Sequence, residues 1–246
     1  MSLWLRSPSL LVGLLFLFFA TGMPLLAPIF HALFPAIEPP IYPGDSFLAL
    51  AFFHAGLVAV SSLAAIVIGV LGGIFATRRA GAEFRPPFEA LATIGQSFPP
   101  VAVLALAVPA FGYGAVPTFV ALAFYGILPV LKNTVAGLAS IPDAIRDAAA
   151  GMGLSPLQQL FRVELPLAAP TILAGIRVSV IVNIGTAAIG STVGAVTLGT
   201  PIIGGLIGDK VGYVIQGAIV IGLLAILTDL AFARIDRRLR RFAARD

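Results

Sequence analysis

The chain has 246 residues, of which 59% are apolar and 11% charged, and its formal net charge is +4. Soluble domains contain about 45–50% apolar and ~25% charged residues, so this composition excludes a soluble protein and indicates an integral membrane protein. The apolar runs are continuous and about twice as long as the ten-residue strands of a membrane barrel. We therefore expect an all-α membrane protein.

Six apolar runs, separated by charged or Pro/Gly-rich segments, predict about six transmembrane helices in a single membrane domain, 1–246. The first run could instead be a cleaved signal peptide, because Arg6 precedes it and Ala20 and Ala27 offer small residues for cleavage. Its removal would leave an odd number of spans, so six is preferred. In chain order the predicted spans are 10–28, 47–76, 88–111, 116–131, 167–189 and 212–232.

The positions of the basic residues predict the orientation. If the amino terminus is cytoplasmic, every Lys and Arg falls in a cytoplasmic segment except Lys210, which is outside, and Arg177, which lies in a span. The stretch from Pro35 to Asp45 carries no basic residue and suits an outside loop. Cytoplasmic loops carry an excess of Lys and Arg, so both termini are predicted to be cytoplasmic.

Two features concern the packing of the spans. The pairs Gly69 with Gly73 and Gly204 with Gly208 have the Gly-x-x-x-Gly spacing that permits close helix contacts. His54 lies about two turns into the second span. We expect it to be a hydrogen-bonded interior residue rather than a metal ligand or a proton carrier.

The sequence lacks the motifs that several common activities require. There is no G-x-x-x-x-G-K-[ST] loop, so the chain is not expected to bind ATP by itself. No H-E-x-x-H motif or carboxylate cluster predicts a metal, and no residue qualifies as catalytic. The carboxylates lie in loops or near span ends, which leaves an ion-coupled transporter without an obvious coupling residue. Nothing indicates a nucleic-acid partner.

Residues at the break in the third span, and polar residues in or just beyond the fifth, are candidates for a translocation pathway. The third span is broken near its middle by a Gln-Ser-Phe-Pro-Pro run, and irregular backbone is tolerated there only against protein or a water-filled cavity. Ser, Thr and Asn can equally bridge neighbouring helices, so this assignment stays open. The candidate pathway residues are Gln96, Phe98, Arg177, Asn183, Thr186, Ser191 and Thr192.

The longest cytoplasmic segment, 132–166, is predicted to contain two short helices. Ser140–Asp143 and Ser155–Gln158 both have the spacing of a capping box, each with a proline near the first helical position. Gly151 and Gly153 are expected to end the first helix through a left-handed turn. The pair Leu165-Pro166 is expected to stop the second helix where the next span begins.

A fixed pattern runs through these two helices. Asp147-Ala148-Ala149, three residues, Gly153, nine residues and Val163-Glu164-Leu165-Pro166 resemble the EAA loop of binding-protein-dependent ABC importer permeases, E-A-A-x3-G-x9-I-x-L-P. The departures, Asp for Glu and Val for Ile, keep charge or shape. The resemblance implies that this loop couples to an ATPase through Asp147, Ala148, Ala149, Gly153, Val163, Leu165 and Pro166.

The segments Asn133–Leu138, Leu165–Arg177 and Asn183–Ala187 are similar to those of permeases of glycine betaine, carnitine and choline osmoprotectant importers, and the resemblance covers roughly residues 45 to 232. The chain departs at Gly194–Gly199, where many relatives are richer in glycine. The resemblance implies a bundle like that of type I ABC importer permeases in a bacterial inner membrane, surrounded by lipid. It also implies three partners: a cytoplasmic ATPase dimer that holds the ATP and magnesium, a second permease subunit of the same or a homologous sequence, and an extracytoplasmic solute-binding protein.

Three alternatives remain from the sequence. The same machinery could carry another small solute, such as an amino acid. A secondary transporter or channel that works alone is less favoured, because an ion-coupled mechanism would have no obvious coupling residue. A structural membrane protein with no transport role is least favoured, because it would have no use for an organised loop at this spacing.

Overall fold

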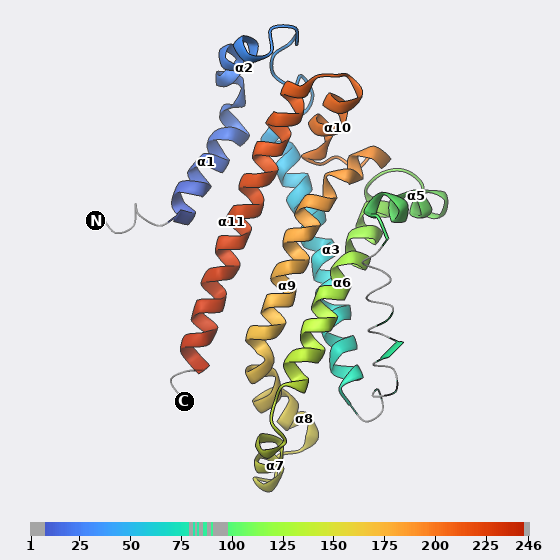
Figure 1. Ribbon diagram of the computed structural model, residues 1–246, viewed down its shortest axis with the longest axis vertical. Coiled ribbons are helices and arrows are strands. Elements are labelled where there is room, and N and C mark those ends of the chain that lie inside the picture. The colour runs from blue at the N-terminus through green and yellow to red at the C-terminus, as the bar shows by residue number, and fades with distance from the viewer. Residues whose placement is uncertain are drawn as a thin grey trace, which may run out of the picture. The chain divides into compact units, whose positions relative to one another are not determined.

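The computed structural model describes residues 8–78, 81, 83, 86, 87, 90 and 98–243, and side chains through Leu239. Every regular element in this part of the chain is a helix, as the composition predicts (Figure 1). Five helical stretches among the described residues are long and apolar enough to cross a membrane: Pro8–Leu33, Phe47–Ala76, Ala115–Ala139, Pro156–Ala187 and Val211–Leu239.

The third predicted span, 88–111, falls partly outside this description. Of its residues, 88, 89 and 91–97 lie outside the described part of the chain, and the remainder contains the short apolar helix α5, Pro100–Phe111. Five of the six predicted spans therefore correspond to a helical stretch that could cross a membrane.

The described helices are longer than the predicted spans at several ends. The first span is made of α1 (Pro8–Gly22), the 3-10 turn η1 (Met23–Leu26) and α2 (Ala27–Leu33), with Pro24 and Pro28 at the starts of the last two. Helix α3 is Phe47–Ala76, α6 is Ala115–Ala139, α9 is Leu165–Ala187, and α11 is Val211–Ala243. The short α10, Gly199–Ile207, precedes α11.

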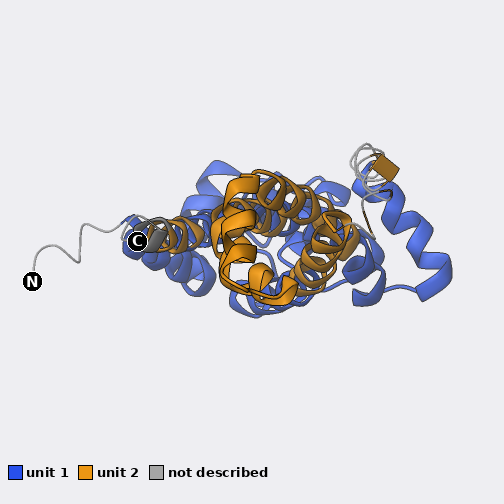
Figure 2. Cartoon of the chain, turned by 90° about the horizontal axis from the view of Figure 1, so that it is seen from below, with its two compact units in different colours: residues 1–61, 99–122, 181–231 blue, residues 62–98, 123–180, 232–246 orange. Residues whose placement is uncertain are grey.

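The chain divides into two compact units (Figure 2). Unit 1 contains residues 1–61, 99–122 and 181–231, and unit 2 contains residues 62–98, 123–180 and 232–246. The long helices α3, α6, α9 and α11 each contribute residues to both units. Each unit is described by itself below.

Unit 1 has an apolar core formed by segments distant in sequence. Met23, Phe47, Leu50, Leu198 and Val220 are buried together, each at 4% exposure or less. They bring η1 of the first span, α3, the start of α10 and α11 against one another. Between helices that cross a membrane, such packing is stabilised mainly by van der Waals contact.

The segment 34–46, which joins α2 to α3, is held to the start of α11 by three side chains. Lys210 Nζ donates to the carbonyl of Glu38 at 2.9 Å, Tyr213 Oη to that of Pro39 at 2.7 Å, and Gln216 Nε2 to that of Pro40 at 2.8 Å. Prolines have no N–H, so this segment cannot pair its backbone regularly. Side chains spaced three residues apart on one helix face satisfy its carbonyls instead.

Unit 2 depends on close contact between the second half of α3 and α6. A Cβ added at Gly69 would lie 2.8 Å from the Cβ of Val130, and one at Gly73 would lie 2.6 Å from the Cβ of Thr134. The close contact predicted for this pair is therefore confirmed. The spacing of Gly204 and Gly208 is not used for a close helix contact among the described residues: a Cβ at Gly204 would meet nothing within 4 Å, and one at Gly208 would approach only the Gly204 carbonyl and Lys210.

Candidate functional site

The predicted cytoplasmic loop forms a helical hairpin at the junction of α6 and α9 in unit 2 (Figure 1). We call residues Ser140–Glu164 the hairpin. Its first helix, α7, is Asp143–Gly151. The Gly153 N–H donates to the carbonyl of Ala150 at 2.9 Å, and the Leu154 N–H donates to that of Ala149 at 3.2 Å. This is a Schellman turn, and Gly153 takes its left-handed position with φ of 79°.

Two other expectations about α7 are wrong. No side chain caps its start. The Ser140 hydroxyl instead donates to the carbonyl of Gly137 at 2.9 Å, because α6 continues to Ala139 and leaves its last carbonyls next to Ser140. Gly151 is the last helical residue and is not one of the glycines with positive φ. The left-handed turn is made by Gly153 alone.

The second helix, α8, is Pro156–Gln159 and begins with the capping box that the sequence predicts. The Gln158 N–H donates to the Ser155 hydroxyl at 3.4 Å, and the Ser155 N–H donates to the Gln158 side-chain oxygen at 2.8 Å. This reciprocal pair satisfies two donors that a helix start would otherwise leave unpaired.

The predicted stop at Leu165-Pro166 is wrong. A π-helical turn, η3 (Leu160–Glu164), follows α8, and the chain then continues directly into α9. The Leu165 N–H donates to the carbonyl of Leu160, five residues back. A proline ring in a regular helix clashes with the carbonyl four residues before it, and the wider π turn admits Pro166 without ending the helix.

The residues of the EAA-like pattern divide between packed and exposed positions. Ala149 is buried, and Leu165 packs against the cluster formed by Leu138 and Ala168. Val163 is half-buried. The exposed members are Asp147, Ala148, Gly153 and Pro166.

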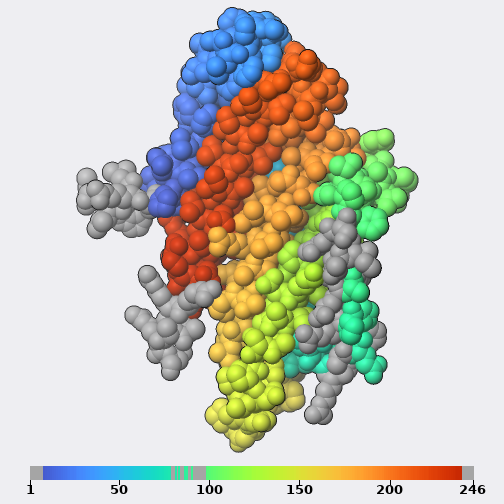
Figure 3. All heavy atoms as spheres, viewed as in Figure 1, coloured from blue at the N-terminus to red at the C-terminus, as the bar shows by residue number. Residues whose placement is uncertain are grey.

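The hairpin also exposes large apolar side chains. Met152 at the turn is 73% exposed, Leu157 on α8 is 68% exposed, and Phe161 in the π turn is 64% exposed. In Figure 3 the yellow atoms of this segment lie uncovered at the lower end of the unit 2 residues. Exposed apolar surface of this kind marks a contact with a protein partner or with a membrane, and the predicted cytoplasmic position of the loop favours a protein partner.

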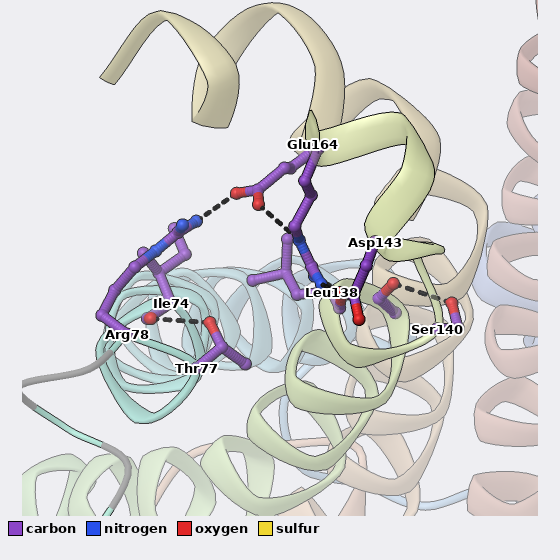
Figure 4. Close-up of polar contacts among 9 residues, drawn as sticks. Ile74, Thr77, Arg78, Leu138, Ser140, Asp143 and Glu164 are labelled. Atoms are coloured by element: carbon purple, nitrogen blue, oxygen red, sulfur yellow. Dashed lines mark hydrogen bonds and ion pairs between the residues drawn. The ribbon is translucent and has the colours of Figure 1, made fainter. Parts of the chain in front are cut away.

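A cluster of charges lies at the base of the hairpin (Figure 4). The Glu164 carboxylate is buried and accepts from Arg78, just past the end of α3, and from Arg146 Nε on α7 at 3.0 Å. Arg146 also donates through Nη2 to the carbonyl of Leu138 at 2.6 Å, near the end of α6. One buried carboxylate thus connects two guanidinium groups from different elements.

The cluster compensates the charge of Glu164. A buried carboxylate is costly without partners, and the hydrogen bonds from Arg78 and Arg146 supply two positive partners. The sequence prediction missed this role, because Glu164 occupies a variable position of the EAA-like pattern. Its acidic character, so close to a span, was the available signal.

A cavity of about 830 Å³ adjoins these charges. It is bounded by the end of α3, the end of α6 and the start of α8. Its lining residues are Ala76, Thr77, Arg78, Leu138, Ala139, Asp143, Arg146, Pro156, Gln159 and Glu164.

The candidate pathway residues fall into separate groups. Gln96 lies outside the described residues. In unit 2, the backbone carbonyl of Phe98 accepts from the Tyr125 hydroxyl, and Arg177 is half-buried on α9. The other four candidates, Asn183, Thr186, Ser191 and Thr192, belong to unit 1.

Within unit 1, Ser191 belongs to a hydroxyl cluster that the sequence prediction missed. Its hydroxyl lies 2.8 Å from that of Thr197 and 3.4 Å from that of Thr200. Thr192 donates to the carbonyl of Ile189 at 2.7 Å, within its own 3-10 turn. These contacts show local hydrogen bonding, and a pore-lining role stays a prediction.

Asn183 and His54 are two further polar residues of unit 1, and both are fully buried. Thr186, one turn after Asn183 on α9, is half-buried. The Nε2 of His54 lies 3.0 Å from the carbonyl of Ile184, near the end of α9. The expectation of a hydrogen-bonded interior histidine is confirmed. Among the described residues, no group of three His, Cys, Asp or Glu side chains could hold a metal ion.

Comparison with known families decides the assignment. A family model described as a binding-protein-dependent transport system inner membrane component matches residues 65–241. The chain belongs to this family. It is a multi-pass inner-membrane permease of an ABC importer and not an enzyme in its own right, so it works with an ATPase and a solute-binding protein.

Several relatives resemble this permease along most of its length. The osmoprotectant import permease protein OsmY of Salmonella typhimurium is 38% identical, over 76% of this chain and 79% of that protein. The choline transport system permease protein OpuBB of Bacillus subtilis is 36% identical, over 80% and 89%. The Bacillus subtilis glycine betaine/carnitine/choline permease protein OpuCB is 38% identical, over 72% and 82%.

Solved structures share the fold of this permease. An inward-facing structure of the MetNI methionine ABC transporter contains a chain with a TM-score of 0.68 and 25% identity, covering 76% of this chain and 93% of that one. A chain from an amino acid ABC transporter crystallised with histidines reaches a TM-score of 0.60 at 17% identity, covering 81% and 93%.

Proposed function

We propose that this permease imports osmoprotectants such as glycine betaine and related quaternary amines. The observation that carries the proposal is the 36–38% identity, over about three quarters of the chain, to permeases whose names specify osmoprotectants or choline. The fold alone is shared with importers of other solutes and would not select this substrate class.

The hairpin is the proposed contact with the ATPase. The Schellman turn after α7 and the capping box of α8 make it a stiff element, and its exposed apolar side chains offer a surface for a groove on the partner. Closure of two ATPase subunits on ATP would move the docked hairpin as a rigid body and move α6 and α9 with it. The EAA-like residues Asp147, Ala148, Ala149, Gly153, Val163, Leu165 and Pro166 are assigned to this coupling.

The proposed assembly contains two permease chains, two ATPases that hold the ATP and magnesium, and one solute-binding protein on the outer side. Each permease chain forms one membrane domain of six spans with both termini in the cytoplasm. This arrangement is supported by the concentration of Arg and Lys in the segments that it places inside.

The translocation pathway is proposed to be lined by Gln96, Phe98, Arg177, Asn183, Thr186, Ser191 and Thr192. A quaternary ammonium group carries a delocalised charge that aromatic faces attract, which favours Phe98 among these residues. Phe98 is 48% exposed within the described chain and is therefore available to a solute.

An amino acid is the second candidate substrate, favoured by the similarity to a chain of the MetNI methionine transporter. The test is uptake by the permease reconstituted with its ATPase and binding protein. We expect ATP-dependent uptake of labelled glycine betaine that unlabelled choline or carnitine reduces and methionine does not. Competition by methionine alone would select the second candidate, and uptake that needs an ion gradient but no ATP would contradict both.

A further inference from the structure

The hairpin is joined to the rest of unit 2 by charges at its base. The Glu164 side chain is 4% exposed and is shared by Arg146, on the hairpin, and Arg78, just past α3. Arg146 also donates to the carbonyl of Leu138 near the end of α6. The cluster therefore connects the hairpin to α3 through Arg78 and to α6 through Arg146 (Figure 4).

Packing connects α3 with the start of the hairpin, where Ile141 belongs to an apolar cluster against which Val70 and Ile74 pack, but packing is interrupted between α3 and α8. The cavity of about 830 Å³ separates Ala76 and Thr77, at the end of α3, from Pro156 and Gln159 on α8. Close-packed interiors transmit displacement through many contacts, and such contacts are missing where a cavity intervenes. The ion pair of Arg78 with Glu164 bridges this part of unit 2.

The pairs within the cluster differ in strength. Asp143, which pairs with Arg146 at 3.1 Å within α7, is 91% exposed, and exposed pairs contribute little. Glu164 is buried, so losing a partner leaves its charge poorly compensated. The link through Glu164 is therefore the strong one.

We propose that Arg78 and Glu164 are positioning residues that transmit the movement of the hairpin to α3. The inference rests on the proposed docking of the hairpin to an ATPase. Neither residue needs to touch the ATPase or the solute, because they act through the hairpin and α3. Without their ion pair, ATP would move the hairpin while α3 followed incompletely.

The main test is Arg78→Gln, which removes the link to α3 and leaves Glu164 paired with Arg146. We expect the variant to assemble with its ATPase and to hydrolyse ATP, while the ATP consumed per imported solute rises severalfold. Arg78→Lys keeps the charge and should restore most of the coupling. Glu164→Gln removes the ion pairs with both Arg78 and Arg146 and should uncouple further, although the bond of Arg146 to the Leu138 carbonyl remains. Asp143→Asn is the matched control, since it removes an exposed pair within one helix, and its coupling should stay normal.

A distance measurement separates coupling from simple stability. The chain has no cysteine, so spin labels at Leu71→Cys on α3 and Ala150→Cys on α7, both exposed, report without background. With Arg78 present, the distance between labels within one chain should be the same with and without ATP. In Arg78→Gln it should change or broaden when ATP binds.

The outcomes distinguish this inference from the proposed function. Normal coupling and an unchanged distance in Arg78→Gln would overturn the inference, as would loss of assembly in Arg78→Gln that Arg78→Lys does not restore. Failure of the wild-type permease to bind an ATPase would contradict the proposed docking instead. Failure to import betaine would contradict only the substrate class, because the distances depend on nucleotide and not on solute.

Discussion

At the scale of single residues, the turn of the hairpin depends on one glycine. Gly153 has φ of 79°, and a Cβ added there would meet nothing within 4 Å. The obstacle to another residue is therefore backbone strain alone, about 1–2 kcal/mol for a left-handed L-residue. That is enough to shift a local conformational equilibrium by a factor of about 5–30.

This strain predicts the effect of Gly153→Ala. The substitution should leave membrane insertion and ATP hydrolysis intact but lower ATP-driven uptake several-fold, because the hairpin no longer holds one conformation. Gly151→Ala is the matched control: Gly151 is helical, and a Cβ there also meets nothing within 4 Å. Ala favours the helix by about 1 kcal/mol over Gly, so the control should transport normally. Equal uptake by the two variants would remove the turn from the mechanism.

The hydrogen-bond partners of single residues are where prediction from the sequence fails. Ser140 and Ser155 have equivalent sequence contexts, yet only Ser155 caps a helix. The Ser140 hydroxyl donates instead to Gly137 of α6, which depends on where α6 ends. The ion pair of Glu164 is likewise not predictable from the sequence, because its partner Arg78 lies 86 positions earlier and only the fold brings the two residues together.

At the scale of helices, hydropathy locates the spans better than their ends. The apolar run 116–131 predicts a span, but α6 continues to Ala139 through polar residues. Asn133 and Thr134 donate to carbonyls of their own helix, at 2.9 and 2.8 Å, and so remain compatible with it. The π turn before α9 has a similar effect, since it carries the helix past Pro166. Both extensions depend on local hydrogen bonds that residue types alone do not reveal.

The contact of α3 with α6 predicts a clear difference between two glycines of α3. Gly73→Ala places a Cβ 2.6 Å from the Cβ of Thr134, so the helices must separate, at a cost of about 1–3 kcal/mol for overpacking. Gly56→Ala, in the same helix, meets nothing within 4 Å and should be neutral or stabilising. Thermal unfolding in detergent measures both. Equal midpoints would show that α3 and α6 do not approach as closely as described.

At the scale of the whole molecule, composition and hydropathy predict the class of fold but not the hydrogen bonds between segments that are distant in the sequence. Lys210, Tyr213 and Gln216 hold carbonyls of Glu38, Pro39 and Pro40 from at least 172 positions away. The sequence shows only that the proline-rich segment lacks donors. Which side chains satisfy its carbonyls follows from the approach of α11, and that approach depends on the packing of the whole of unit 1.

The orientation of the chain gives the last prediction. Three predicted spans, 47–76, 88–111 and 116–131, separate Asp45 from Ala150, so an odd number of crossings should place them on opposite sides of the membrane. The chain has no cysteine, and both positions are exposed, so Asp45→Cys and Ala150→Cys can be labelled individually. A membrane-impermeant thiol reagent should label Asp45→Cys in intact cells and Ala150→Cys only after permeabilisation. The reverse pattern would place the hairpin outside, beyond reach of any ATPase. Labelling of both from the same side would mean that 88–111, which lies partly beyond the described residues, does not cross.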